Sequence, residues 1–172
     1  MYQGAKRESP HHLRQHCWDD QYILLYTQGK HMKKQKGALR SGVLGNPLEM
    51  GFWILEQWLS LRQKQKNLIP FFQDNFIKTI AIYGMGVLGK RLYEELQNSE
   101  IKIRYAIDRN PGAKTKLDFE VYGLKESALS SVDAIVVTPV YDYWPIVGSL
   151  EMKTNAPILS LKDIVDYCVT GG

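Results

Sequence analysis

From Lys78 onward, short apolar runs rich in β-branched residues alternate with stretches in which apolar residues recur every three to four positions. The runs predict buried strands and the stretches predict amphipathic helices. The predicted strands cover residues 79–83, 101–107, 119–122, 134–137 and 157–160, and the predicted helical segments cover 87–97, 125–129, 143–151 and 161–167. Such alternation is typical of an α/β fold, here a doubly wound parallel sheet of about five strands.

A longer amphipathic helix is predicted before this region, over residues 47–66, because Asn46-Pro47 is a helix-opening pair. Its apolar residues cover more than one narrow stripe: Met50, Phe52, Trp53, Ile54, Leu55, Trp58, Leu59 and Leu61. Two interpretations remain open. The whole surface packs on the following domain, or part of it binds a second copy of the chain or another partner.

Residues 1–45 are polar and basic, apart from the apolar run at 22–26, and are predicted to be poorly ordered. We therefore divide the chain into a basic N-terminal segment (1–45), a helical lead-in (46–76) and the sheet domain (77–172). The histidines His11, His12, His16 and His31 all lie in the first segment. The spacing of His12 and His16 would suit a metal ion on a helix, but a flexible tail is favoured because nothing nearby shapes a closed site, so no metal site is predicted.

The formal charge of +4 belongs to the first fifty residues, which contain eight Lys or Arg and four Asp or Glu; the rest has fourteen of each. A nucleic-acid partner is therefore not expected. The two cysteines, Cys17 and Cys168, are too far apart in sequence for a disulfide framework or zinc motif. No apolar run is long enough to span a bilayer and no signal-peptide core is present, so a cytoplasmic location is expected.

One motif indicates a binding function. Gly84-Met85-Gly86-Val87-Leu88-Gly89 follows the first predicted strand and opens a helix, and Asp108 closes the next strand nineteen residues later. This is the spacing of a Rossmann-type dinucleotide site. Gly84 would allow the tight turn, Gly86 would leave room for a pyrophosphate, and Gly89 would let the helix pack closely. The predicted cofactor-binding residues are these six together with Asp108, Arg109, Thr138 and Pro139.

The expected cofactor is NAD. Asp108 would accept hydrogen bonds from ribose hydroxyls and repel a 2′-phosphate, although the neighbouring Arg109 weakens this preference. The alternative is a Rossmann fold that keeps its glycines for backbone geometry and binds nothing. A phosphate-binding loop of the ATPase type is disfavoured, because Arg91 stands where Ser or Thr should bind magnesium and Asp133 precedes its strand.

Residues for a reaction are harder to find. No histidine follows residue 33, and neither Tyr93, Tyr141 nor Tyr143 has a lysine four positions later, so no catalytic residue is assigned. Tyr141, Asp142 and Tyr143 follow the fourth predicted strand, where a ligand could contact them. They could equally be loop residues with packing roles.

Segments 81–86, 105–108 and 133–138, with the helix bearing Trp53 to Leu61, resemble small Rossmann modules found beside bacterial polysaccharide and capsule glycosyltransferases. The resemblance covers roughly residues 47–168. It implies a role in cell-surface glycan synthesis, with a glycosyltransferase as a possible partner through helix 47–66, and it implies no particular activity.

A more distant similarity is to the NAD-binding half of the glucose-fructose oxidoreductase and inositol dehydrogenase family. It implies a cofactor site at Gly84, Gly86, Gly89 and Asp108. The catalysis of that family does not carry over: Tyr143 stands in place of its histidine, 159–162 lacks its Glu-Lys-Pro segment, and its substrate domain has no counterpart here.

These observations predict an NAD-type nucleotide-binding module, accessory or regulatory in bacterial surface-polysaccharide biosynthesis. The alternative is an NAD-dependent oxidoreductase, or an enzyme that modifies nucleotide sugars, whose substrate site comes from a partner chain. A third possibility is an interaction protein with an empty Rossmann fold.

Overall fold

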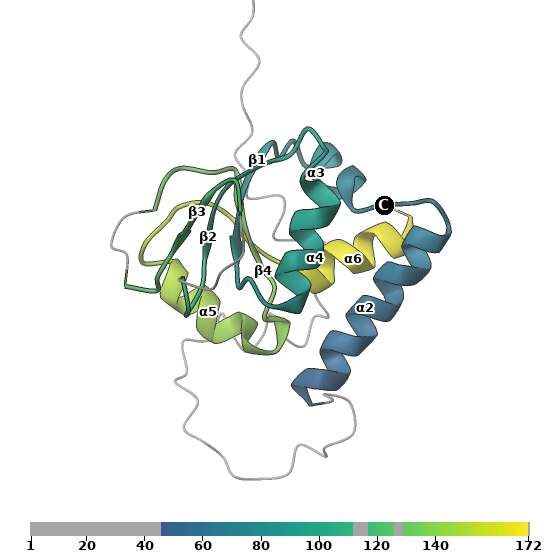
Figure 1. Cartoon of the computed structure of the whole chain (residues 1–172), viewed down its shortest axis with the longest axis horizontal. Helices are drawn as coiled ribbons and strands as arrows, with labels where there is room; N and C mark the ends of the chain where they lie inside the picture. Colours follow the sequence, from purple (N-terminus) through teal and green to yellow (C-terminus); the bar gives the residue numbers. More distant parts are fainter. Residues whose placement is uncertain (1–45, 112–116, 126–128, 172) are drawn as a thin grey trace, which may run out of the picture. The chain divides into compact units, whose positions relative to one another are not determined.

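A computed structural model describes residues 46–111, 117–125 and 129–171 (Figure 1). The predicted N-terminal segment 1–45, its histidines and most of the helical turn predicted at 125–129 lie outside these residues. The elements in chain order are α2 (Pro47–Gln63), α3 (Ile69–Asp74), β1 (Thr79–Tyr83), α4 (Val87–Leu96), β2 (Lys102–Ile107), β3 (Glu120–Tyr122), β4 (Ala134–Val137), the 3-10 turn η2 (Val140–Asp142), α5 (Tyr143–Leu150), β5 (Ile158–Ser160) and α6 (Leu161–Thr170).

The five strands form one parallel sheet in the order β3-β2-β1-β4-β5. The predicted α/β fold with a doubly wound parallel sheet is therefore confirmed. β1 lies at the centre, between β2 and β4, and four of its five residues are buried, as are all four of β4. This burial on both faces explains why these two strands are almost continuously apolar.

Helices cover both faces of the sheet (Figure 1). On one face, α2, α3, α4 and α6 share a core with β1, β2 and β4, centred on side chains such as Phe72, Ile82 and Leu92. On the other face, α5 packs on a smaller core that contains Tyr83, Tyr105 and Ile135. The helical lead-in thus contributes to the same core as the sheet.

α2 begins with a complete capping box. The Asn46 side chain accepts hydrogen bonds from the backbone N–H groups of Leu48 and Glu49, and the Glu49 carboxylate accepts one from Asn46 N–H. These contacts satisfy N–H groups that have no partner within the helix. The predicted start is correct, and the helix ends three residues before the predicted end.

Two short elements, α3 and η2, were not predicted. α3 has six residues and contains Pro70 in its first turn, so it is too short to show helical periodicity. Tertiary packing stabilises it: Phe71 and Phe72 are buried, and the Phe71 ring meets the Tyr167 ring edge to face at 5.2 Å. η2 is a single turn that follows Thr138-Pro139.

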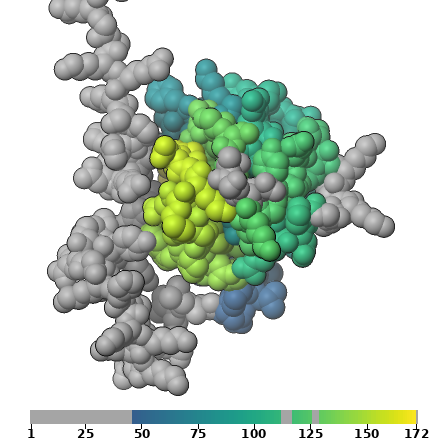
Figure 2. All heavy atoms as spheres, turned by 90° about the vertical axis from the view of Figure 1, so that its left-hand side faces the viewer, coloured from purple at the N-terminus to yellow at the C-terminus, as the bar shows by residue number. Residues whose placement is uncertain are grey.

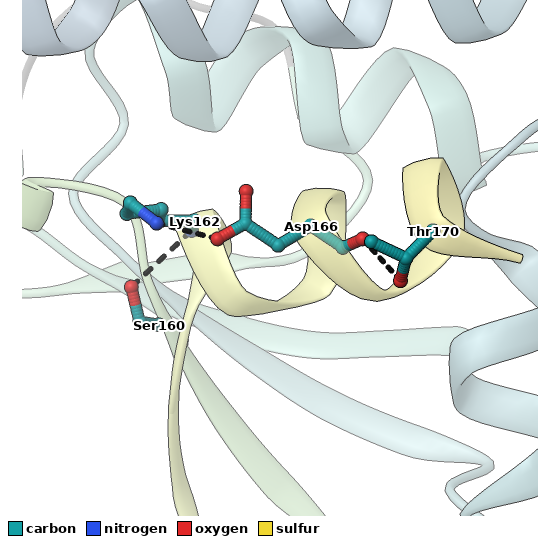
Figure 3. A network of polar contacts seen from close by, with 4 residues as sticks. All are labelled: Ser160, Lys162, Asp166 and Thr170. Atoms are coloured by element: carbon teal, nitrogen blue, oxygen red, sulfur yellow. Dashed lines mark hydrogen bonds and ion pairs between the residues drawn. The ribbon is translucent and has the colours of Figure 1, made fainter. Parts of the chain in front are cut away.

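α6 carries its own ladder of polar contacts (Figure 3). The Ser160 hydroxyl caps the helix by accepting a hydrogen bond from Lys162 N–H at 3.2 Å. Lys162 pairs with Asp166 one turn later, and the Thr170 hydroxyl donates to the Asp166 carbonyl at 3.0 Å. The cap holds the junction between β5 and α6 at the carboxyl edge of the sheet.

Among the helices of the described residues, none combines the length and the apolar character needed to cross a membrane.

Candidate functional site

The candidate site lies where the carboxyl ends of β1, β2 and β4 meet. The chain leaves β1 toward β2 on one side and later returns to pair β4 with the other side of β1. Ligands of open α/β sheets bind at such a switch point, outside the carboxyl ends of the strands. The glycine turn, Asp108-Arg109 and the segment 138–142 follow these three strands directly.

Gly84 makes the turn that leaves β1. Its φ of +90° lies in the left-handed region that favours glycine. A Cβ here would stand 2.7 Å from the Pro139 ring and 2.9 Å from the Thr138 hydroxyl. Both the backbone conformation and the close approach of the segment after β4 therefore require glycine.

Gly89, in the first turn of α4, is required to be glycine by a close contact. A Cβ at this position would lie 2.0 Å from the Gly84 carbonyl oxygen, which is far inside van der Waals contact. Glycine lets the helix come down onto the turn that precedes it. Gly89 is accordingly buried.

Gly86 is the one glycine of the motif that neither a positive φ nor a close contact requires. Its φ of −69° is open to any residue, and a Cβ would meet nothing within 4 Å. The residue is exposed and forms the N-cap of α4. Space is therefore left beside the backbone at the point where a pyrophosphate would approach.

The start of α4 suits an anion. The helix runs for ten residues, and no side chain caps its N-terminus. The N–H groups of its first turn have no partner within the helix, and its dipole favours negative charge there. Val87, in that turn, is 69% exposed, so the backbone is accessible from outside.

Asp108 is tied to the glycine turn. Its Oδ2 accepts a hydrogen bond from Met85 N–H at 2.6 Å, and its Oδ1 accepts one from Asn110 N–H at 2.9 Å. Each carboxylate oxygen can accept a second hydrogen bond, so both can still receive ribose hydroxyls. The residue predicted to bind the ribose thus also holds the turn in place.

Arg109 and Asp142 form an ion pair between the ends of β2 and β4, with 3.6 Å between Nη2 and Oδ2. Arg109 is 71% exposed, and such exposed pairs contribute only about 0–1 kcal/mol. The pair is therefore easily opened. Arg109 offers hydrogen-bond donors and Asp142 acceptors to a ligand in the same region.

Tyr83, the last residue of β1, belongs to this cluster and was not predicted. Burial raises the pKa of Tyr83; the Arg109 charge opposes this, and the Asp108 and Asp142 charges reinforce it. The tyrosine is only 7% exposed. Its position directly before Gly84 could have predicted that Tyr83 lies beside the site. The apolar pattern of the strand, however, predicts only that it is a core residue.

Thr138 and Pro139 line the turn from the side of β4. The Thr138 hydroxyl is buried and donates to the Gly84 carbonyl at 2.7 Å, with the Tyr83 carbonyl as a second, longer acceptor at 3.2 Å. Net, each such hydrogen bond contributes about 1 kcal/mol to stability. Thr138 thereby fixes the path of the turn.

The three residues predicted as possible ligand contacts are placed differently. Tyr141 is 53% exposed beside the site, and Asp142 faces Arg109. The Tyr143 hydroxyl donates to the Ile158 carbonyl at 2.8 Å and its ring packs on Trp144, so this side chain is engaged with β5 and α5.

A cavity of about 140 Å³ lies on the α5 side of the sheet. Tyr83 and Ile107 line it from the strand ends, and Leu124, Leu150 and Lys153 line it from the other side. Ligand pockets usually measure about 300–1,000 Å³, so this volume is too small for a dinucleotide. None of the residues of the glycine turn lines it, and we therefore place the site at the open carboxyl edge.

Within the described part of the chain, no group of three or more His, Cys, Asp or Glu stands together as a metal site would require.

In comparisons with known proteins, no family model matches the chain, and no curated protein and no solved structure is significantly similar to it.

Proposed function

We propose that the chain is a nucleotide-binding module that holds NAD across the carboxyl ends of β1, β2 and β4. One observation carries the proposal: Gly86 has an ordinary φ and open space beside it, so neither backbone strain nor a close contact requires glycine there. Glycine is an acceptable N-cap, but Asn, Asp or Ser would cap α4 with a side chain and stabilise it slightly more. A ligand that must approach the backbone gives a reason for glycine at this position.

The roles follow from the geometry. The backbone N–H groups at the start of α4 would bind the pyrophosphate. Asp108 would accept hydrogen bonds from the adenosine ribose, and its charge favours NAD over NADP. Arg109 would lie beside the same ribose, where it limits that preference.

The resemblance of residues 47–168 to modules beside glycosyltransferases supports an accessory or regulatory role in bacterial surface-polysaccharide assembly. The binding of a nucleotide suits such a role, because surface glycans are built from nucleotide sugars. Mass spectrometry of the small molecule that co-purifies with the native chain tests this directly. NAD, or a nucleotide sugar in its place, would identify the ligand class.

Calorimetry with NAD tests the site itself. Gly86→Val places a branched side chain where the pyrophosphate would lie, so binding is expected to disappear. The chain should stay folded, with a small drop in the unfolding midpoint because valine is a poorer N-cap than glycine. Gly148→Val, at an exposed helical glycine on α5 that also has open space beside it, is the matched control and should bind as the parent does. Unchanged NAD affinity in Gly86→Val would rule out this site.

Asp108 provides a second test of the same site. Asp108→Ala is expected to weaken NAD binding by about 1–3 kcal/mol, the usual cost of losing charge-assisted hydrogen bonds. It should also reduce the difference in affinity between NAD and NADP. Asp108→Asn keeps one oxygen that can accept the hydrogen bond from Met85 N–H. This variant therefore separates the effect of the lost charge on NAD affinity from the effect of a disturbed glycine turn. Equal affinities of all three chains for both cofactors would contradict the assignment.

The alternative function is an NAD-dependent oxidoreductase, or an enzyme acting on nucleotide sugars, that takes its substrate site from a partner chain. The exposed Arg109–Asp142 ion pair favours keeping this alternative, since it offers charged groups to a substrate at the same edge of the sheet.

A further inference from the structure

The ion pair between Arg109 and Asp142 spans the carboxyl end of β1. Arg109 follows β2 and Asp142 follows β4, and β1 lies between these two strands. Neighbouring strands of a sheet are about 4.8 Å apart, so the pair bridges about 10 Å. Burial raises the pKa of Tyr83, the last residue of β1; the Arg109 charge opposes this rise and the Asp142 charge adds to it. The Arg109 side chain is therefore directed across the end of β1, toward the segment after β4.

Asp108, the neighbour of Arg109 in sequence, is directed elsewhere. Its carboxylate accepts hydrogen bonds from Met85 N–H at 2.6 Å and from Asn110 N–H at 2.9 Å, which hold it at the glycine turn. The two neighbours have opposite preferences at the ribose of a dinucleotide. A carboxylate accepts hydrogen bonds from a 2′-hydroxyl group, whereas an arginine binds a 2′-phosphate. Selectivity between NAD and NADP therefore depends on whether Arg109 is available beside that ribose.

Asp142 competes with such a phosphate for Arg109. Its Oδ2 lies 3.6 Å from Arg109 Nη2, and both side chains reach solvent. Figure 2 shows the green to yellow-green part of the chain, which includes α5, at the surface of the face drawn there. An exposed ion pair is weak enough to exchange one partner for a ligand. Asp142 therefore reduces, without abolishing, the attraction of Arg109 for a phosphate group.

We propose that Asp142 is a positioning residue that favours NAD over NADP by drawing Arg109 away from the ribose that Asp108 binds. This inference rests on the proposed function and assigns specificity within the same site. Asp108 repels a 2′-phosphate, and Asp142 holds back the arginine that would offset this repulsion. The preference for NAD thus depends on two acidic residues, which follow different strands of the sheet.

Calorimetry of the full chain with NAD and with NADP tests the role of Asp142. The variant Asp142→Asn removes the charge but keeps a residue suited to the N-cap of α5. The affinity for NADP relative to that for NAD should rise by about two- to five-fold, the range expected from an exposed ion pair. A merely disturbed loop would weaken the binding of both cofactors and leave the ratio of their affinities unchanged.

Glu94→Gln is the matched control. Glu94 also forms an exposed ion pair with an arginine, Arg91, but in the second half of α4, so the ratio should stay as in the parent. Arg109→Gln completes a double-mutant cycle. It should lower NADP affinity more in the Asp142→Asn background than in the parent, and the double variant should lose the gain that Asp142→Asn gives. The cycle separates an action through Arg109 from the effect of the Asp142 charge itself.

The possible outcomes distinguish this inference from the proposed function. A parent chain that binds neither cofactor would overturn both. If the parent binds NAD, an unchanged ratio in Asp142→Asn, or an equal rise with Arg109→Gln present, would overturn only the role of Asp142. An equal gain in affinity for NAD and NADP would also overturn it, because Arg109 would then bind the pyrophosphate that both cofactors share.

Discussion

At the scale of single residues, the three glycines of the turn have different reasons to be glycine. Gly84 has a positive φ, Gly89 meets a carbonyl oxygen, and Gly86 faces open space. The sequence motif shows them as equivalent positions in a pattern. Substitution should therefore separate Gly84 and Gly89, which the fold requires, from Gly86, which we propose serves ligand binding.

Gly89→Ala is expected to lower the free energy of unfolding by about 1–3 kcal/mol, because the added methyl group must push α4 away from the Gly84 carbonyl. Gly86→Ala meets no clash and should lower it by only about 0.5–1 kcal/mol, because alanine is a poorer N-cap than glycine. Urea unfolding of the two variants measures both. Equal stabilities would mean that α4 does not pack on the turn as closely as the 2.0 Å approach implies.

Asp163, in the first turn of α6, should make stability depend on pH. Burial raises the pKa of Asp163 from 3.8 to about 6; Lys162 opposes the shift and Asp166 adds to it. The folded state therefore holds a proton more tightly than the unfolded chain. Stability is expected to fall as the pH rises from about 4 to about 6, and to remain lower above that range.

The substitution Asp163→Asn removes this titration. It should raise the free energy of unfolding at pH 7 by about 1–3 kcal/mol, and change it little near pH 4. Exposed Glu151→Gln serves as the control, with no such difference between the two pH values. Chemical unfolding at both pH values gives the comparison, and a loss of stability at pH 7 would show that the charged carboxylate is stabilising instead.

At the scale of elements, α2 and α3 end in the same way. Gln65 and Phe76 have left-handed φ values of 61° and 56°. After α2, Lys66 N–H donates to the Leu61 carbonyl, and after α3, Ile77 N–H donates to the Phe72 carbonyl. This is the helix end at which glycine is the usual residue.

Gln65→Gly and Phe76→Gly are each expected to raise the free energy of unfolding by about 1 kcal/mol, since the left-handed conformation costs a residue with a side chain about that much. Phe76 is 88% exposed, so little burial is lost. Gln63→Gly, inside the last turn of α2, should lower stability by a similar amount. Thermal unfolding ranks the three variants, and a loss of stability in the first two would contradict the assignment of strain.

At the scale of the whole molecule, the isolated chain is expected to bind NAD without oxidising a substrate. Hydride transfer needs a group that takes the substrate's proton and a pocket that holds the substrate. Tyr83 has a raised pKa and the Tyr143 hydroxyl is bonded to Ile158, so neither is suited to act as a base near neutral pH.

An assay of NADH formation with nucleotide sugars and polyols tests this. The chain alone should show no turnover, with or without Tyr83→Phe. Turnover that disappears in Tyr83→Phe but survives Gly148→Val would instead establish an oxidoreductase that is complete in one chain. Tyr143→Phe is a poorer probe, since it also removes a hydrogen bond to β5.

The sequence by itself determined the class of fold and most strand positions, because burial between two layers of helices imposes an apolar run on each central strand. β1 and β4 have the predicted bounds, and the other three strands end as predicted but begin one residue later. The spacing of Gly84, Gly86 and Gly89 also predicted a turn between a strand and a helix. These are local patterns, and a single segment carries each of them.

Only the tertiary structure decided what meets at the carboxyl edge. Arg109 and Asp142 are thirty-three residues apart, and Tyr83 joins them because β1 lies between β2 and β4. α3 and η2 form because neighbouring elements pack on them, and the exposure of Leu48, Phe52 and Leu59 depends on which face of α2 packs on α6. Such contacts depend on how distant segments pack, which no local periodicity encodes.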